Sequence, residues 1–186
     1  ENGVAVLKLT FDDPGTLDSH TVEVDWGDGT VETIAVAAGS RTFTANHQYL
    51  DDNPTGTSAD NYTVSVKVRD DDGGEATGNA TAKVLNVPPG NVVVTPVATI
   101  TNEGTQVNLG IAFNDAGSQD THQVEINWGD GNVTTATAVG HTLNANHTYG
   151  DNGTYAVIVK VVDDDGGQAT GSAAVMANNV APFNRQ

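Results

Sequence analysis

Aspartates gather in short polar stretches that separate runs of alternating apolar and polar residues. Two of these stretches in each half contain most of the aspartates, and glycines stand beside the acids in both. Carboxylates at this density support two kinds of chemistry, because they bind hard cations such as Ca²⁺ and because a suitably spaced pair hydrolyses glycosides. The acids concerned are Asp12, Asp13, Asp18, Asp70 and Asp72 in the first half, and Asp115, Asp120, Asp163 and Asp165 in the second.

Catalysis by these acids is not supported by the rest of the sequence. Trp26 and Trp128 are the only tryptophans, and both fall within an apolar strand pattern, so they form no aromatic platform for a sugar. Motifs of the Gly-x-Ser-x-Gly, His-Glu-x-x-His or phosphate-loop type do not occur. We therefore predict that the protein is not an enzyme. Two interpretations of the acids stay open, a cation site and simple turn chemistry, because Asp-Asp-Asp-Gly-Gly also favours a hairpin turn without an ion.

The overall charge narrows the choice of partners. The chain has 24 acidic and 7 basic residues, which gives a net charge of −17 at pH 7. Nucleic acid is excluded as a partner, because no basic surface exists to neutralise phosphates. No apolar run approaches the roughly 20 residues of a membrane span, so we expect no direct membrane insertion. Cysteine is absent, and a metal is the obvious substitute for disulfides in stabilising small domains.

The sequence is an internal duplication. Residues 20–29 and 122–131 are identical at seven of ten positions, and the agreement continues to the end of each half. The segment Asn86-Val-Pro-Pro-Gly90 separates the copies, because two prolines cannot lie in a central strand. We predict domains at residues 1–87 and 88–178, with residues 179–186 as the start of the next linker. The first domain lacks a counterpart of residues 92–101, its opening strand.

The elements that position the acids are short strands. Val22, Val24 and Trp26 alternate with polar residues, as do the valines between Tyr62 and Val68, and this period of two is typical of half-buried strands. We therefore predict an all-β fold, with the tryptophans in the two cores. Tyr62 and Tyr155 occupy the place where a β-sandwich carries a tyrosine corner.

Three motifs together resemble the polycystic-kidney-disease (PKD) repeat. They are Val24-Asp-Trp-Gly-Asp-Gly-Thr30, His47-Gln-Tyr49 and the strand from Tyr62 to Asp70, and all three recur in the second half. The resemblance implies two tandem immunoglobulin-like, seven-stranded β-sandwiches, the first without its opening strand. The Trp-Gly-Asp-Gly segment is then a tight turn, and His47 and His147 are packed, hydrogen-bonded residues rather than metal ligands.

Sandwich topology brings the acidic loops to one end of each domain, where their mutual repulsion favours a bound cation. Some PKD-like and cadherin-like repeats bind Ca²⁺ at such junctions. By this resemblance the second repeat would bind Ca²⁺ through Asn86, Asp115, Asp120, Asp163 and Asp165. The first repeat offers Asp12, Asp13, Asp18, Asp70 and Asp72 at equivalent places. Glu103 lies at the opposite end, where it would reach the calcium of a following domain.

The resemblance implies a non-catalytic role in an extracellular, cell-surface or secreted protein. We expect a structural spacer or adhesive segment whose junctions are stiffened by Ca²⁺ and whose partners are neighbouring repeats, surface glycans or proteins. Two alternatives remain: a carbohydrate- or protein-binding module of a secreted enzyme, and a filament subunit that assembles by strand donation.

Overall fold

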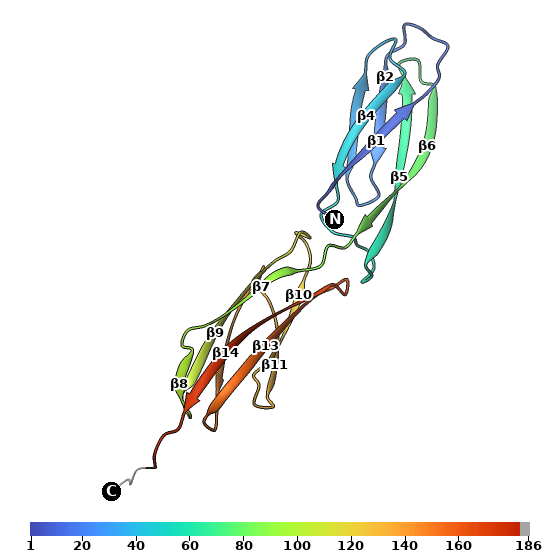
Figure 1. Cartoon of the computed structure of the whole chain (residues 1–186). Helices are drawn as coiled ribbons and strands as arrows, with labels where there is room; N and C mark the ends of the chain where they lie inside the picture. The colour runs from blue at the N-terminus through green and yellow to red at the C-terminus, as the bar shows by residue number, and fades with distance from the viewer. Residues whose placement is uncertain (183–186) are drawn as a thin grey trace. The chain divides into compact units, whose positions relative to one another are not determined.

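The computed structural model describes residues 1–182, which form strands and no helix (Figure 1). The chain divides into two compact units, residues 1–86 and 87–186. Both are β-sandwiches, which confirms the predicted all-β fold. Within the described residues no helix is long and apolar enough to span a membrane. The expected start of a next linker lies partly outside the described residues, because it includes residues 183–186.

The first domain has a two-stranded sheet, β1-β4, and a four-stranded sheet in the order β3-β2-β5-β6. All pairings within these sheets are antiparallel. The strands are β1 (Val4–Thr10), β2 (His20–Asp25), β3 (Val31–Val36), β4 (Thr42–Gln48), β5 (Ala59–Asp70) and β6 (Glu75–Leu85).

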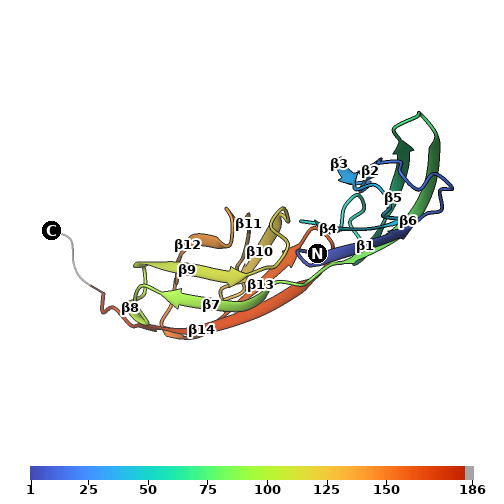
Figure 2. The same cartoon turned by 90° about the horizontal axis from the view of Figure 1, so that it is seen from above.

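The second domain has sheets in the orders β12-β9-β7 and β11-β10-β13-β14-β8. Its opening strand contributes to both sheets, because β7 pairs antiparallel with β9 whereas β8 pairs parallel with β14. Figure 2 shows β7 and β9 side by side. The strands are β7 (Gly90–Pro96), β8 (Ile100–Asn102), β9 (Gln106–Asn114), β10 (His122–Asn127), β11 (Val133–Thr137), β12 (Thr142–Thr148), β13 (Gly153–Asp163) and β14 (Gln168–Asn178).

The core of each domain lies between its two sheets and is made of the alternating apolar residues. Val22 and Val24 are fully buried, and Trp26 and Trp128 are 2% and 1% exposed. The period-two pattern therefore assigned the inward faces correctly, and the prediction of core tryptophans is confirmed.

In each domain a tryptophan, a histidine and a tyrosine pack together at the edge of the core and are held by hydrogen bonds. In the first domain the His47 ring stacks on Trp26 with centroids 4.9 Å apart, and its Nε2 lies 2.7 Å from Asp28 Oδ2. The Tyr49 hydroxyl donates to the Trp26 carbonyl at 2.9 Å. Asp28 Oδ1 also accepts the Thr30 amide, as expected for a tight turn. The histidine is thus a packed structural residue, as predicted from the sequence.

The second domain repeats this group with matching geometry. His147 stacks on Trp128 at 4.8 Å and bonds Asp130 at 2.7 Å. The corner tyrosines also agree in kind, since the hydroxyls of Tyr62 and Tyr155 donate to the carbonyls of Asp51 and Asp151 at 3.2 and 2.9 Å, although the acceptor lies 11 residues upstream in the first domain and 4 in the second. The duplication therefore preserves contacts as well as sequence.

Candidate metal site

Three carboxylates meet at one end of the first domain. Asp13 and Asp18 belong to the loop between β1 and β2, and Asp70 ends β5. One oxygen from each lies within 4.8 Å of the others. The chain joins them for a simple reason: β2 and β5 are paired with His20 opposite Asp70, so the loop before β2 and the turn after β5 share one edge.

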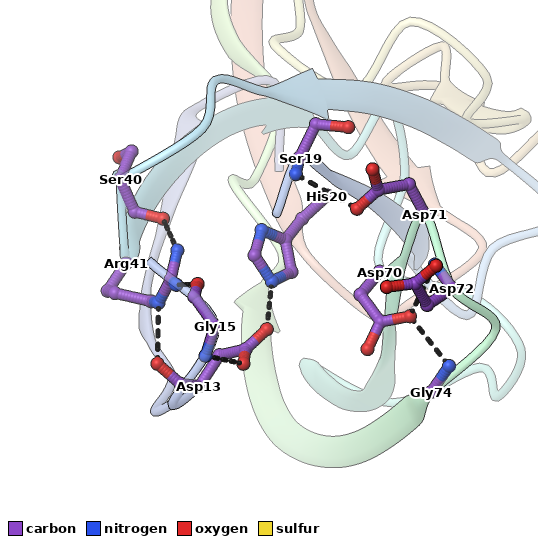
Figure 3. Close-up of polar contacts among 10 residues, drawn as sticks. All are labelled: Asp13, Gly15, Ser19, His20, Ser40, Arg41, Asp70, Asp71, Asp72 and Gly74. Carbon is purple, nitrogen blue, oxygen red and sulfur yellow. Dashed lines mark hydrogen bonds and ion pairs between the residues drawn. The ribbon is translucent and has the colours of Figure 1, made fainter. Parts of the chain in front are cut away.

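His20 orients the first of these acids. The residue is 4% exposed at the start of β2, and its Nε2 lies 2.6 Å from Asp13 Oδ2. The other oxygen of Asp13 accepts the Gly15 amide at 2.9 Å. These two hydrogen bonds, with that from His20 the stronger influence, hold the pKa of Asp13 below its ordinary value. Figure 3 shows His20 with Asp13 on one side and the Asp70–Gly74 turn on the other.

Asp18 experiences the opposite electrostatic environment. Burial raises its pKa, and the negative charges of Asp13, Asp71, Asp72 and Asp70 raise it further. Its carboxylate also packs so closely on Gly15 that a Cβ at that position would collide with it. The neighbouring carboxylates therefore surround Asp18 with a negative potential, which disfavours its charged form unless a cation offsets it.

The Arg41 side chain holds the loop in place by donating hydrogen bonds to backbone carbonyls. Its guanidinium donates to the carbonyls of Asp13, at 3.3 Å, of Ser40, at 3.0 Å, and of Gly15. It also lies over the Phe11 ring, 5.8 Å from the centroid. The cation thus fixes the curvature of the loop that presents Asp13.

Asp70 serves the turn as well as the cluster. Its Oδ1 accepts the amides of Asp72 and Gly74 at 3.0 and 2.7 Å. The turn interpretation and the cation interpretation are therefore compatible, because one carboxylate contributes to both. Asp12 and Asp72, which we also predicted as ligands, are exposed and lie outside the cluster of close oxygens within the described part of the chain.

The second domain builds its cluster around Asp120. One group of close oxygen and nitrogen atoms contains Asp115, Asp120 and His122, and another contains Asp120, Asp164 and Asp165, each within 4.8 Å. His122 Nε2 lies 2.7 Å from Asp115 Oδ2, as in the first domain. A glycine again makes room, because a Cβ on Gly117 would collide with the Asp120 carboxylate.

Three further predicted ligands, Asp163, Asn86 and Glu103, have different surroundings. Asp163 Oδ1 accepts the amides of Asp165 and Gly167, at 3.1 and 2.6 Å, and so supports the turn. Asn86 is the last residue of the first domain, and its role toward the second stays a prediction. Glu103 Oε1 accepts the Val180 amide at 2.7 Å, where the chain leaves β14, and its role toward a following domain also stays a prediction.

Sequence reasoning missed two pairs of residues. His20 and His122 were not assigned to the cluster, although they stand at the same position of both copies. Asp71 and Asp164 each tie the two loops together, by accepting the amides of Ser19 at 3.1 Å and Thr121 at 2.9 Å. Their repetition in the duplicate was an available signal for both pairs.

Comparisons with known proteins agree with the fold and the motifs. Residues 86–177 match the family model of the PKD domain. The PKD domain of an M14-like peptidase from a Thermoplasmatales archaeon is 29% identical, covering 50% of this chain and 97% of that one with a TM-score of 0.44. The PKD domain of the human VPS10 domain-containing receptor SorCS2 is 19% identical, covering 54% and 82%, with a TM-score of 0.43.

A longer structural match covers both domains. A tetra-tandem repeat from the extending region of a large adhesion protein is 16% identical, covering 95% of this chain and 50% of that one with a TM-score of 0.50. No curated protein matches the sequence. Fold and motifs together define a pair of immunoglobulin-like tandem repeats. The second repeat belongs to the PKD-domain family, and the first repeat shares its motifs.

Proposed function

We propose that the two domains form a non-catalytic spacer or adhesive segment of a cell-surface or secreted protein, and that each binds Ca²⁺ at its acidic loop end. The observation that carries the proposal is the repetition of the cluster: both domains place a His-bonded aspartate, Asp13 or Asp115, beside a second carboxylate, Asp18 or Asp120. A structural ion that supports a repeat is expected in every copy of that repeat. An active site, by contrast, is needed only once.

The donor atoms suit calcium. Ca²⁺ binds oxygen at roughly 2.3–2.6 Å, so two ligands of one ion lie at most about 5 Å apart. The oxygens of Asp13, Asp18 and Asp70 fall within 4.8 Å of each other. Burial first, and then the charges of nearby carboxylates, raise the pKa of Asp18. A bound cation would neutralise those charges. Zn²⁺ fits less well, because it prefers nitrogen and sulfur ligands and His20 already bonds Asp13.

Each residue has a distinct part in this site. His20 orients Asp13, Gly15 leaves room for Asp18, and Asp71 ties the loop to the turn. A bound ion would add charge neutralisation and a second tie between these two segments.

The position of the linker suggests how a bound ion could affect the stiffness of the junction between repeats. Its two prolines restrict the backbone between Asn86 and Gly90. Within the second domain, Pro88 lies against the acidic turn, since a Cβ on Gly167 would come 2.9 Å from Pro88 Cα. An ion that orders this turn would therefore also restrain the linker. We propose that Ca²⁺ stiffens the junction between repeats.

Calorimetric titration of the whole chain tests the binding. We expect two Ca²⁺ per chain, with one lost in Asp18→Asn and the other in Asp120→Asn. Asp12→Asn is the matched control, because it removes the same charge from the same loop at an exposed position. Equal binding by all four proteins would disprove these sites.

Small-angle scattering tests the stiffening separately. Calcium should narrow the distribution of intramolecular distances for the wild-type chain, and Asp120→Asn should resemble the calcium-free protein at all calcium concentrations. If wild type and variant gave one curve under both conditions, the stiffening role would be wrong even with binding intact.

A further inference from the structure

The last two long strands of each domain agree on their inward face and differ on their outward face. Strands β13 and β14 of the second domain correspond to β5 and β6 of the first. A tyrosine and three valines recur in the same order on the inward faces of β5 and β13. The core accounts for that agreement, but it does not account for the outward face. Five polar or charged outward residues of the first domain, Thr63, Ser65, Arg69, Thr81 and Lys83, correspond in the second to Ala156, Ile158, Val162, Ala174 and Met176.

The apolar residues of the second domain form one continuous surface on its five-stranded sheet. Strands β13 and β14 lie side by side (Figure 1), and Ala156 and Ala174 are exposed cross-strand partners on them. Ile158 of β13 is 49% exposed, and Met176 of β14 is 39% exposed. The pairing of β11 with β10 and of β8 with β14 adds one exposed residue from each outer strand. We call this surface the apolar stripe: Ile100, Val133, Ala156, Ile158, Ala174 and Met176.

The surroundings of the apolar stripe carry no net charge. Among the described outward-facing residues of β10, β11, β13 and β14, only Glu125 and Lys160 are charged. They oppose each other in the pairing of β10 with β13, directly beside the stripe. An acidic chain with a net charge of −17 therefore has a sheet face on which one anion balances one cation.

We infer that the apolar stripe is a self-association surface, and that its occupant is the stripe of a second copy of this chain. A two-fold interface is built from the same patch of both copies, so the patch must be self-complementary. The stripe offers apolar side chains to apolar side chains, and Lys160 of each copy can pair with Glu125 of the other. The small side chains of Ala156 and Ala174 also let two sheets pack closely face to face.

The net charge favours this surface for association between copies. Two chains of charge −17 repel each other, and the repulsion is weakest where the facing surfaces have no net charge. The area suffices for a weak dimer. From strand spacing and rise per residue, the outward face of β10, β11, β13 and β14 measures roughly 19 Å by 30 Å. Two such faces bury about 1,200 Å² in total, which is the low end of specific interfaces.

Sedimentation equilibrium of the whole chain in EDTA tests the inference independently of the proposed calcium sites, because chelation removes any calcium bridge between copies. We expect a monomer–dimer equilibrium with a dissociation constant on the order of 10–100 µM. A chain that stays monomeric at millimolar concentration would overturn the inference and leave the stripe to a different partner. Dimers that form only with Ca²⁺ would also overturn it, by assigning association to the acidic loops.

Substitutions at Ile158 locate the contact. Ile158→Ser copies the residue of the first domain, and Ile158→Asp places like charges in the interface. Each should weaken dimerisation at least roughly tenfold. The melting temperature should stay near that of the wild type, because this side chain is already 49% exposed. Ser65→Asp is the matched control, since it adds the same charge at the equivalent exposed position of the first domain, and it should dimerise normally. Equal dimerisation by Ile158→Asp and Ser65→Asp would place the contact elsewhere and overturn the inference.

A charge exchange tests the two-fold arrangement. Lys160→Glu and Glu125→Lys should each dimerise at least roughly tenfold more weakly alone, because like charges then face each other across the interface. An equimolar mixture of the two variants should recover a dimer that contains one copy of each. A mixture that associates no more strongly than either variant alone would overturn the inference of a two-fold pair.

Discussion

The two domains share one pattern of apolar residues, but their cores are buried to different extents. Leu109 of β9 is 1% exposed, whereas its equivalent on β1, Leu7, is partly buried. The difference does not come from the strands themselves, since both alternate in the same way. It comes from β7, which covers only the second core. Hydrophobic periodicity therefore specifies which face of a strand turns inward, and a neighbouring strand determines how completely that face is buried.

Truncation of the core tryptophans should have the largest effect on the stability of both domains. Trp26→Ala and Trp128→Ala should each lower the free energy of unfolding of their domain by about 3–5 kcal/mol, because a large buried side chain leaves a cavity. Calorimetry that resolves two transitions would assign each loss. Phenylalanine at the same positions should cost less, and an unchanged transition would contradict the core assignment.

The matched pair Leu109→Ala and Leu7→Ala tests the unequal cores directly. The first should cost about 2–5 kcal/mol, and the second clearly less, because Leu7 already contacts solvent. Chemical denaturation followed by domain-specific fluorescence of Trp26 and Trp128 would measure both. Equal losses would mean that the first core is as complete as the second.

Calcium should stabilise both domains by similar amounts if their clusters are equivalent. Free Ca²⁺ at about 100 times its dissociation constant adds roughly 2.7 kcal/mol to the folded state. Melting in EDTA and in millimolar Ca²⁺, with Mg²⁺ and NaCl as controls for charge screening, measures this gain. Identical melts in all four solutions would leave turn formation as the whole role of the acids.

The smallest effect on stability is expected from Asp28 and Asp130, which occupy equivalent positions in the two domains. Burial alone would raise the pKa of Asp28, but hydrogen bonds from Thr30 and His47 outweigh it and hold this pKa below the ordinary value of 3.8. The pKa of Asp130 is lowered against burial in the same way, by His147 and Asn132. A carboxyl group whose pKa is lowered by folding stabilises the folded state when the pH is above the ordinary pKa. This stabilisation is lost as the pH falls through the folded-state pKa.

We therefore expect stability to fall with acid below about pH 4, and Asp28→Asn or Asp130→Asn to flatten that dependence in its own domain. At neutral pH each substitution should cost on the order of 1 kcal/mol or less. Urea unfolding between pH 2 and pH 7 would show this. A variant as acid-sensitive as the wild type would assign the loss to other carboxylates.

The loop ends show where prediction from sequence stopped. Topology correctly brought Asp13, Asp18 and Asp70 to one place, because strand order and direction determine which loops are neighbours. It could not reveal that Asp163 Oδ1 would accept turn amides, or that His20 would bond Asp13. Side-chain directions in loops follow no period, so they depend on rotamers and local hydrogen bonds.

The sequence by itself determined the all-β class, the duplication, the inward faces and the core tryptophans, because each depends on residue order and local periodicity. Only the tertiary structure decided which acids converge on Asp18 and Asp120, and that Arg41 fixes one loop through its backbone carbonyls. It also decided that Gly78 faces open space while its duplicate, Gly171, supports a strand. Those features depend on distances between segments far apart in the chain, which no local pattern records.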